Sequence, residues 1–313
     1  MCDGAHWEVG DTLRRVKYSA VRTDSPQKLL NRHNGNMVTI PQIKLHDGNS
    51  IPQLGFGVFR VDPQETKRVV LDALEVGYRH LDTAAIYGNE REVGQAIAES
   101  GIPREEIFLT TKLWNSRHAD APVAIAESME KLGVDYLDLY LIHWPAQVQN
   151  LYVEAWKDLE GFKEAGLVRS IGVSNFHPEH LKRLKDAGCQ TPVIDQVEIH
   201  PAFQQKFITD YCRNEGIAIE AWSPLGQGGY PLFETAPVVE AAKAHEKTPA
   251  QVVLRWHLEK GYIIFPKSTH KERMKENIDI FDFTLSEQET AAIDAMEIGE
   301  AGRQGASIEE RGV

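Results

Sequence analysis

The chain has 313 residues, of which 42% are hydrophobic and 26% are charged, and this ordinary globular composition excludes wholesale disorder. It carries 46 acidic against 34 basic residues, and the net charge of −12 argues against a general nucleic-acid-binding protein while allowing a local basic pocket for a phosphorylated ligand. No stretch approaches the ~18–20 consecutive apolar residues of a membrane helix, so we expect no membrane-spanning segment.

The cysteines are few and widely spaced. Cys2, Cys189 and Cys212 form no CxxC pair, which disfavours a disulfide framework or a structural zinc site and is typical of reduced thiols. The N-terminus also lacks the continuous apolar core, roughly 7–15 residues long, of a secretory signal. We therefore expect a cytoplasmic protein.

Residues 1–36 differ in character from the rest of the chain. They show no clear periodicity and contain few apolar residues. Their four arginines resemble those of a transit peptide, but four acidic residues in the same stretch argue against one. We interpret 1–36 as a flexible N-terminal extension, with the alternative that the natural protein begins at Met37, and 37–313 as one folded domain.

A β-hairpin is predicted where regular alternation begins. The strand-like segments Val38–Leu45 and Ile51–Leu54 flank the polar sequence His46–Ser50, which contains Asp-Gly-Asn-Ser. Gly, Asn and Asp between two alternating segments are the usual signal for a hairpin turn.

Short apolar segments then alternate with amphipathic stretches down to residue 266. The predicted strands are Leu54–Gly57, Arg79–Asp82, Ile107–Lys112, Leu137–His143, Ser170–Ser174, Val193–Glu198, Ala218–Trp222 and Tyr262–Pro266. The predicted helices are Pro63–Glu75, Ala121–Leu132, Val153–Ala165, Pro178–Asp186, Pro237–His245 and Pro249–Glu259. Several of these helices begin with proline, whose missing N–H costs nothing in a first turn.

Eight strands, each followed by a helix or helical loop, predict an α/β fold of the (β/α)8 TIM-barrel type. The rival is a doubly wound Rossmann sheet, which requires a GxGxxG sequence after its first strand. In this chain Gly55–Arg60 breaks that pattern at the third glycine, which favours the barrel.

Polar residues end successive predicted strands, where a barrel carries its functional side chains. Asp82 ends the second strand, Lys112 the third and His143 the fourth, and Tyr87 follows in the loop after Asp82. Neighbouring strand ends are close in space, so we expect these four side chains to share one pocket. Each residue alone is better explained by a structural role, and the inference depends on their joint position.

The four residues together suit proton donation to an oxygen. The reference pKa of tyrosine is about 10, and a neighbouring ammonium lowers it by stabilising the phenolate. Asp82 can hold the buried Lys112 as an ion pair, and His143 can donate a hydrogen bond to a carbonyl oxygen. We therefore expect Tyr87, tuned by Lys112, to protonate an oxygen on which negative charge develops.

Five ordered motifs resemble the signatures of the aldo-keto reductases. They are Gly77–Glu90, Thr111–Asn115, Leu141–Pro145, Gly172–Phe176 and Phe265–Ser268. The resemblance extends from about Val38 to Gly299, and Ala221–Gly228 is similar to the bacterial 2,5-diketo-D-gluconate reductases of that family.

The resemblance implies a barrel whose N-terminal end is plugged by the hairpin, and an NADPH-dependent enzyme that reduces carbonyls by direct hydride transfer. It makes Tyr87 the general acid, Lys112 and Asp82 its tuning pair, and His143 the residue that orients the carbonyl. Some relatives that reduce carbon–carbon double bonds carry glutamate at the histidine position, so His143 favours carbonyl chemistry.

The resemblance also assigns residues to each part of NADPH. Ser174, Asn175 and Gln196 are assigned to the carboxamide, and Trp222 to the nicotinamide ring. Ser223, Leu225 and Gln227 are assigned to the pyrophosphate. Lys267, Ser268 and Arg273 are assigned to the 2′-phosphate, and Glu276 and Asn277 to the adenine. His270 stands where close relatives often carry arginine, and a neutral imidazole supplies no charge to a phosphate. NADH is therefore expected as a weaker second cofactor.

The expected substrate is a small polar carbonyl, either a keto-sugar acid such as 2,5-diketo-D-gluconate or a 2-oxoaldehyde such as methylglyoxal. Phe59, Trp114, Trp144 and His143 are the expected substrate contacts, and the tail over 299–313 is polar, which suggests an open, wet pocket. We expect a monomer with no metal, nucleic-acid or membrane partner. Two alternatives remain, a non-catalytic NADPH-binding regulatory subunit of the same fold and a barrel lyase or isomerase with a Schiff base on Lys112.

Overall fold

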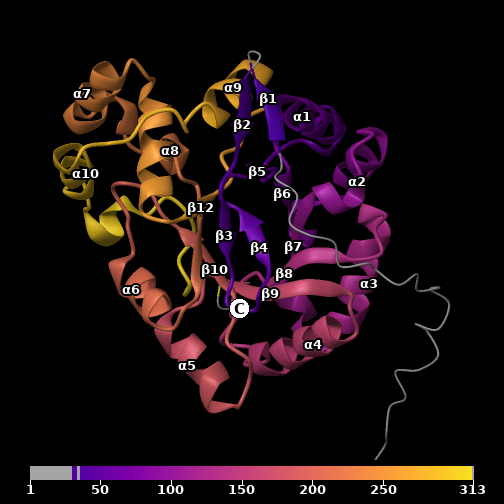
Figure 1. Ribbon diagram of the computed structural model, residues 1–313. Coiled ribbons are helices and arrows are strands. Elements are labelled where there is room, and N and C mark those ends of the chain that lie inside the picture. Colours follow the sequence, from indigo (N-terminus) through magenta and orange to yellow (C-terminus); the bar gives the residue numbers. More distant parts are fainter. Residues whose placement is uncertain (1–29, 34–35, 312–313) are drawn as a thin grey trace, which may run out of the picture.

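The computed structural model describes residues 30–33 and 36–311, and its centre is a sheet of eight parallel strands surrounded by helices (Figure 1). The strands are β5 (Phe56–Gly57), β6 (His80–Asp82), β7 (Phe108–Leu113), β8 (Leu137–Ile142), β9 (Val168–Ser174), β10 (Ile194–Glu198), β11 (Ala218–Trp222) and β12 (Ile263–Ile264). Each strand pairs with the next along the chain, in the order β12-β11-β10-β9-β8-β7-β6-β5.

The two edges of this sheet meet and close the barrel. Leu54, just before β5, forms a parallel bridge with Ile264 of β12, and the Gly55 N–H donates to the Ile264 carbonyl at 2.7 Å. The predicted (β/α)8 TIM barrel is confirmed, and all eight predicted strands are present.

The helices alternate with the strands and cover the outside of the barrel (Figure 1). They are α1 (Pro63–Val76), α2 (Glu90–Glu99), α3 (Ala121–Leu132), α4 (Tyr152–Glu164), α5 (Pro178–Asp186), α6 (Lys206–Asn214), α7 (Ala236–His245), α8 (Pro249–Glu259), α9 (Lys271–Ile278) and α10 (Glu287–Asp294). The six predicted helices all form, while α2, α6, α9 and α10 lie outside the predicted stretches.

Local sequence signals set the ends of the predicted helices. The Asp62 carboxylate accepts a hydrogen bond from the Gln64 N–H at 2.9 Å, Pro63 occupies the first turn of α1, and Gly77 ends the helix at a φ of 122°. At α8, Thr248 and Gln251 form a capping box. These signals are present in the sequence, and they set where α1 begins and ends and where α8 begins.

The antiparallel pair β3 (Gln42–Lys44) and β4 (Ser50–Pro52) is the predicted hairpin, and it plugs one end of the barrel. Leu45 and Ile51 are buried in a cluster with interior residues, including Ile194 and Ile263 at the start of their strands. The His46 ring contacts the Pro192 carbonyl at 3.1 Å, just before β10. The plugged end is therefore the N-terminal end, which leaves the carboxyl ends of the strands for the site.

A second hairpin joins β1 (Leu30–His33) to β2 (Asn36–Thr39), and β1 lies beside α1 (Figure 1). The predicted boundary between an extension over 1–36 and a domain from Met37 falls inside β2. The Asn34-Gly35 sequence between the strands is a strong hairpin signal that the prediction did not use. Residues 1–29 of the predicted extension lie outside the described part of the chain.

Candidate functional site

A cavity of about 610 Å³ opens at the carboxyl ends of the strands. Fourteen of the predicted site residues line it: Phe59, Asp82, Tyr87, Trp114, His143, Trp144, Ser174, Asn175, Gln196, Trp222, Ser223, Leu225, Gln227 and Lys267. Lys112 lies beneath the cavity, fully buried, while Ser268, Arg273, Glu276 and Asn277 lie beyond it, on the segment that leads from β12 into α9. The structure thus brings the expected catalytic and substrate residues together in one place.

Lys112 is held at the floor of this cavity by three oxygen atoms. Its ammonium Nζ donates to Asp82 Oδ1 at 2.7 Å, to Asp82 Oδ2 at 2.9 Å and to the Thr83 carbonyl at 2.9 Å. The same Nζ lies 5.2 Å from the centroid of the Tyr87 ring. The predicted ion pair is therefore present, and it places a fixed positive charge beside the tyrosine.

The charge states of this pair follow from burial and from the neighbouring carboxylate. Burial opposes the Lys112 ammonium, but Asp82 and Tyr87 outweigh it, so the pKa of Lys112 is raised and the amine stays charged. A charged amine cannot act as the nucleophile that a Schiff base requires. The arrangement argues against the lyase or isomerase alternative.

The expected lowering of the Tyr87 pKa is wrong in net direction. Burial raises the pKa of Tyr87, and the Asp82 carboxylate adds to the rise, while the Lys112 ammonium opposes it without reversing it. The phenol therefore keeps its proton at neutral pH, which is the state that a proton donor needs. Lys112 contributes by stabilising the phenolate that remains after the proton has left.

His143 is a neutral imidazole at the same floor. Burial, reinforced by the charges of Lys112 and Arg311, holds its pKa well below the usual range. Its ring meets the rings of Tyr87 and Trp114 edge-on, at centroid distances of 5.8 and 5.2 Å. Its Nδ1 is buried and has no hydrogen-bond partner among residues 39–311, and a neutral imidazole can donate from one ring nitrogen.

Glu220 is a buried acid at the site that sequence reasoning missed. It lies on β11, fully buried, and the Gln196 amide donates to both Glu220 Oε2 at 2.7 Å and Asp82 Oδ2 at 2.9 Å. Both amide protons of Gln196 are thereby used, which leaves its oxygen for a ligand. The available signal was a lone glutamate inside the apolar strand Ala218–Trp222.

We predict that Glu220→Gln changes how stability depends on pH. Burial, reinforced by Asp82, raises the pKa of Glu220 to about 8. Between the ordinary carboxyl pKa of about 4.3 and this value, the folded state binds a proton that the unfolded state lacks, so stability falls as the pH rises through this window. In the parent, the free energy of unfolding should fall by an amount on the order of a few kcal/mol between pH 5 and 9 for this reason. The variant should not show this fall.

Urea unfolding at several pH values measures this effect. Glu240→Gln, which changes an exposed carboxylate on α7, is the control and should keep the pH dependence of the parent. Equal slopes for the parent and Glu220→Gln would contradict the assignment.

A hydrogen-bonded group holds the expected nicotinamide residues in place. The Asn175 amide donates to the His143 carbonyl and to Ser174 Oγ, both at 3.0 Å, and its oxygen accepts from Trp222 Nε1 at 3.0 Å. Ser174 Oγ in turn donates to the Gln196 carbonyl at 2.7 Å. These contacts fix the Trp222 indole at one wall of the cavity.

The loop after β11 reaches across the mouth of the cavity. Gln227 donates to Ser223 Oγ at 2.6 Å and accepts from the Arg60 guanidinium at 3.3 Å. Ser223, Gln227 and Arg60 all have positive φ values, of 52°, 49° and 58°. Three non-glycine residues in this conformation at one place are uncommon and typical of a functional site.

A second, more open hollow contains Arg273, His270 and Lys271, and Arg60 lines both hollows. Lys271 forms ion pairs with Asp72 at 3.5 Å and Glu75 at 2.7 Å, whereas no ion pair of Arg273 occurs among the described side chains. Ser268 Oγ accepts from the His270 N–H at 3.1 Å.

The two residues expected at the adenine, Glu276 and Asn277, lie on α9. The Glu276 carboxylate accepts from Thr248 Oγ1 at 2.6 Å, which ties α9 to α8, and Asn277 is buried.

The C-terminal tail supplies cavity residues that sequence reasoning missed. Gln304, Gly305, Ala306 and Arg311 all line the cavity. They lie more than 80 residues beyond Trp222, and no periodic pattern marked them.

The described residues also bear on membrane-spanning segments, metal ligands and cysteines. No helix in the described part of the chain is long and apolar enough to cross a membrane. Across residues 30–33 and 36–311, no group of three or more His, Cys, Asp or Glu side chains could hold a metal ion. His180 accepts from the His177 N–H at 3.1 Å and caps α5. Cys189 and Cys212 are free thiols, and Cys2 lies outside the described residues.

Comparisons with known proteins agree with this geometry. The model of the aldo/keto reductase family matches residues 53–298. The chain is 48% identical over 263 residues to a protein of Yersinia pestis named methylglyoxal reductase DkgA. The matched region covers 84% of this chain and 95% of that protein.

Solved structures give the same result. An aldo/keto reductase from Brucella melitensis is 50% identical, with a TM-score of 0.79 over 82% of this chain and all of that one. A variant of the protein Gox0644 in complex with NADPH is 43% identical, with a TM-score of 0.82 over 87% of this chain and 98% of that one.

Proposed function

The chain belongs to the aldo/keto reductase family and is an NADP-dependent oxidoreductase, and from this premise we propose that it reduces small polar aldehydes and ketones to alcohols. The observation that carries the proposal is the convergence of Tyr87, the buried Lys112–Asp82 ion pair and the neutral His143 on one cavity floor. Such a set can hold a carbonyl oxygen, protonate it and stabilise the phenolate left behind.

NADPH, when bound, supplies the hydride that reduces the carbonyl carbon. The residues of this chain orient the carbonyl and supply the proton. His143 donates a hydrogen bond that orients the carbonyl, and Tyr87 gives its phenolic proton to the oxygen as negative charge develops there. Lys112 stabilises the tyrosinate, and Asp82 keeps Lys112 in place.

The donor set fits the cofactor. The Gln196 oxygen is left to accept from a carboxamide NH2, and the Ser174 hydroxyl and Asn175 amide beside it can exchange bonds within their group for a bond to the carboxamide oxygen. The adjacent Trp222 presents an aromatic face on which a flat ring can stack. We propose that Ser223, Leu225 and Gln227 cover the pyrophosphate. The remaining contacts proposed are Lys267, Ser268 and Arg273 for the 2′-phosphate, and Glu276 and Asn277 for adenine.

We predict that Arg273→Ala raises the KM for NADPH about tenfold, because a charge-assisted contact to the 2′-phosphate is lost, and leaves the KM for NADH unchanged. Lys271→Ala is the matched control. Lys271 is engaged by Asp72 and Glu75, so its removal should change the NADPH KM much less. Steady-state kinetics with both cofactors measure this difference, and equal effects of the two substitutions would contradict the assignment.

The substrate class is proposed from the polar tail and from the relative named methylglyoxal reductase. The test is a steady-state panel of methylglyoxal, keto-sugar acids and aromatic aldehydes, each with NADPH and NADH. We expect the small polar carbonyls to give the highest kcat/KM with NADPH. Tight NADPH binding with no turnover on any of them would instead support the regulatory-subunit alternative.

We also propose a cytoplasmic monomer. The two described cysteines are free thiols, as expected in a reducing compartment. Light scattering on the purified protein measures the oligomeric state.

A further inference from the structure

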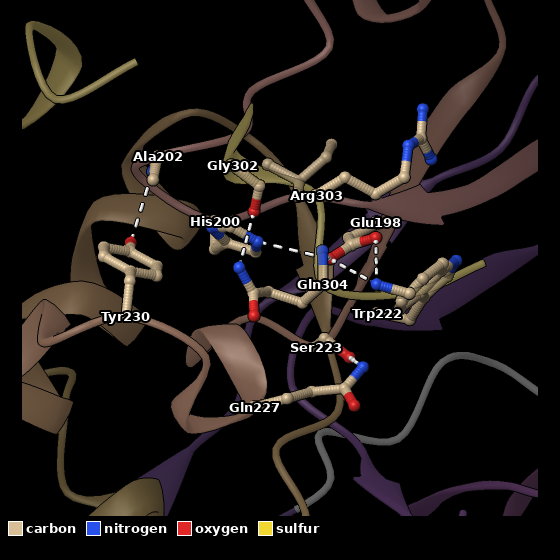
Figure 2. A network of polar contacts seen from close by, with 12 residues as sticks. Glu198, His200, Ala202, Trp222, Ser223, Gln227, Tyr230, Gly302, Arg303 and Gln304 are labelled. Carbon is tan, nitrogen blue, oxygen red and sulfur yellow. Dashed lines mark hydrogen bonds and ion pairs between the residues drawn. The ribbon is translucent and has the colours of Figure 1, made fainter. Parts of the chain in front are cut away.

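Glu198 is a fully buried acid that the proposed reaction does not use. It ends β10 at the cavity end of the barrel but is absent from the cavity lining. Its carboxylate accepts from the Gln304 N–H at 2.8 Å, the Gly305 N–H at 3.0 Å and His200 Nε2 at 3.2 Å (Figure 2). Two of these donors are backbone groups of the C-terminal tail, more than 100 residues away in sequence.

The tail packs against the barrel with no room for additional atoms. A Cβ at Gly305 would overlap the six-membered ring of Trp222, and a Cβ at Gly302 would overlap the Ala202 carbonyl. A Cβ at Gly229 would meet only the flexible end of the Gln304 side chain, which can shift. Glycine at 302 and 305 allows the tail to lie directly on Ala202 and on Trp222.

Further contacts keep the same segment in register. The Arg303 guanidinium lies 4.5 Å from the centroid of the Phe203 ring, and the Gln304 amide donates to the Gly302 carbonyl at 2.9 Å. The His200 ring stacks near Tyr230 at a centroid distance of 5.5 Å, and the Tyr230 hydroxyl accepts from the Ala202 N–H at 3.2 Å (Figure 2). The Glu198 carboxylate is the buried polar centre of this network.

The docked segment forms part of the cavity. Gln304, Gly305 and Ala306 line it, beside Trp222. If the tail left the barrel, the cavity would lose this wall and Trp222 would lose the packing on one edge of its indole.

We propose that Glu198 is a positioning residue that docks the C-terminal segment Gly302–Ala306 on Trp222 and so forms one wall of the substrate cavity. Its effect on catalysis rests on the proposed function, whereas the docking itself does not. The carboxylate is suited to the task because its two oxygens can accept from all three N–H donors at once.

Glu198→Gln tests the proposal with little change in volume. The amide places an NH2 group where three N–H donors converge. If the NH2 takes the Oε2 position, the Gly305 N–H keeps only its longer contact with the other oxygen, at 3.3 Å, and if it takes the Oε1 position, the Gln304 N–H loses its acceptor. Trypsin should then cleave after Arg303 about tenfold faster, because loss of a hydrogen bond to a charged group shifts the docking equilibrium by about that factor. Mass spectrometry of the released peptides that begin at Gln304, residues 304–313 and the product 304–311 of a second cut after Arg311, measures the rate. Glu287→Gln, the same change at an exposed position of α10, is the control and should cleave like the parent.

Kinetics give the second readout. We expect the KM for methylglyoxal to rise about tenfold in Glu198→Gln, with kcat largely kept, because the wall contacts the substrate and not the reacting proton. Gly305→Ala changes the tail and leaves Glu198 intact. It should show the same faster cleavage and the same rise in KM. Near-UV circular dichroism establishes that each variant is folded.

The outcomes separate the docking from the activity. Cleavage after Arg303 at the rate of the Glu287→Gln control in both variants would overturn the proposal, whatever the activity. Faster cleavage with an unchanged KM would overturn the claim that the tail forms a substrate wall. A parent protein that reduces no carbonyl would refute the proposed function, and the cleavage rates would still decide the docking.

Discussion

Tyr87→Phe should lower kcat for carbonyl reduction by about 10²–10⁴-fold, the range that a positioned general acid supplies. The substitution removes only the phenolic oxygen, so the ring keeps its contact with Phe59 at a centroid distance of 4.9 Å and its edge contact with His143. The affinity for NADPH, measured by fluorescence titration, should stay that of the parent. A loss of turnover without a loss of binding is what a proton donor predicts.

The matched control is Tyr136→Phe. The Tyr136 hydroxyl is buried and lacks a hydrogen-bond partner within the described chain, and its ring lies between Arg104 and Arg169, outside the lining of the cavity. This control should keep the parent kcat. If Tyr87→Phe kept most of its turnover as well, another group would have to donate the proton.

Lys112→Met should destabilise the fold and stop catalysis together. It leaves the Asp82 carboxylate buried without its countercharge and the Thr83 carbonyl without its donor, and breaking a buried ion pair from one side costs about 3–5 kcal/mol. The same change removes the charge that stabilises the Tyr87 phenolate. Urea unfolding and steady-state kinetics on one preparation measure both effects.

The double variant Asp82→Asn with Lys112→Met separates the two effects. Removing both charges should recover much of the stability, because no uncompensated charge is then buried, while turnover should stay low. Recovery of turnover in the double variant would show that the ion pair acts only on folding.

The barrel could be predicted because its signals are local. Each strand is a short apolar segment, and most of the predicted helices carry proline in the first turn. The α2 helix was missed because Gly94 interrupts its pattern, yet glycine is needed there, since a Cβ would overlap the Leu132 carbonyl of α3. The requirement comes from helix–helix packing, which no sequence window of α2 contains.

Part of the site could be predicted, because the functional side chains of a barrel lie at the carboxyl ends of its strands. Asp82, Lys112 and His143 follow from their places at the ends of neighbouring strands. The contact of Glu198 with Gly305 joins segments far apart in sequence, and nothing local marks it.

The net direction of the Tyr87 pKa also escaped prediction. It depends on how deeply the ring is buried and how near Asp82 lies, and these are properties of the folded chain.

The proposed reaction is the direct transfer of a hydride to a carbonyl held against Tyr87 and His143. Reduction of methylglyoxal with NADPH deuterated at the transferred position of nicotinamide C4, followed by mass spectrometry of the alcohol, measures this transfer. We expect an alcohol in which one deuterium sits on the former carbonyl carbon. An alcohol without deuterium, or NADPH that binds and is never oxidised by any carbonyl of the panel, would contradict it.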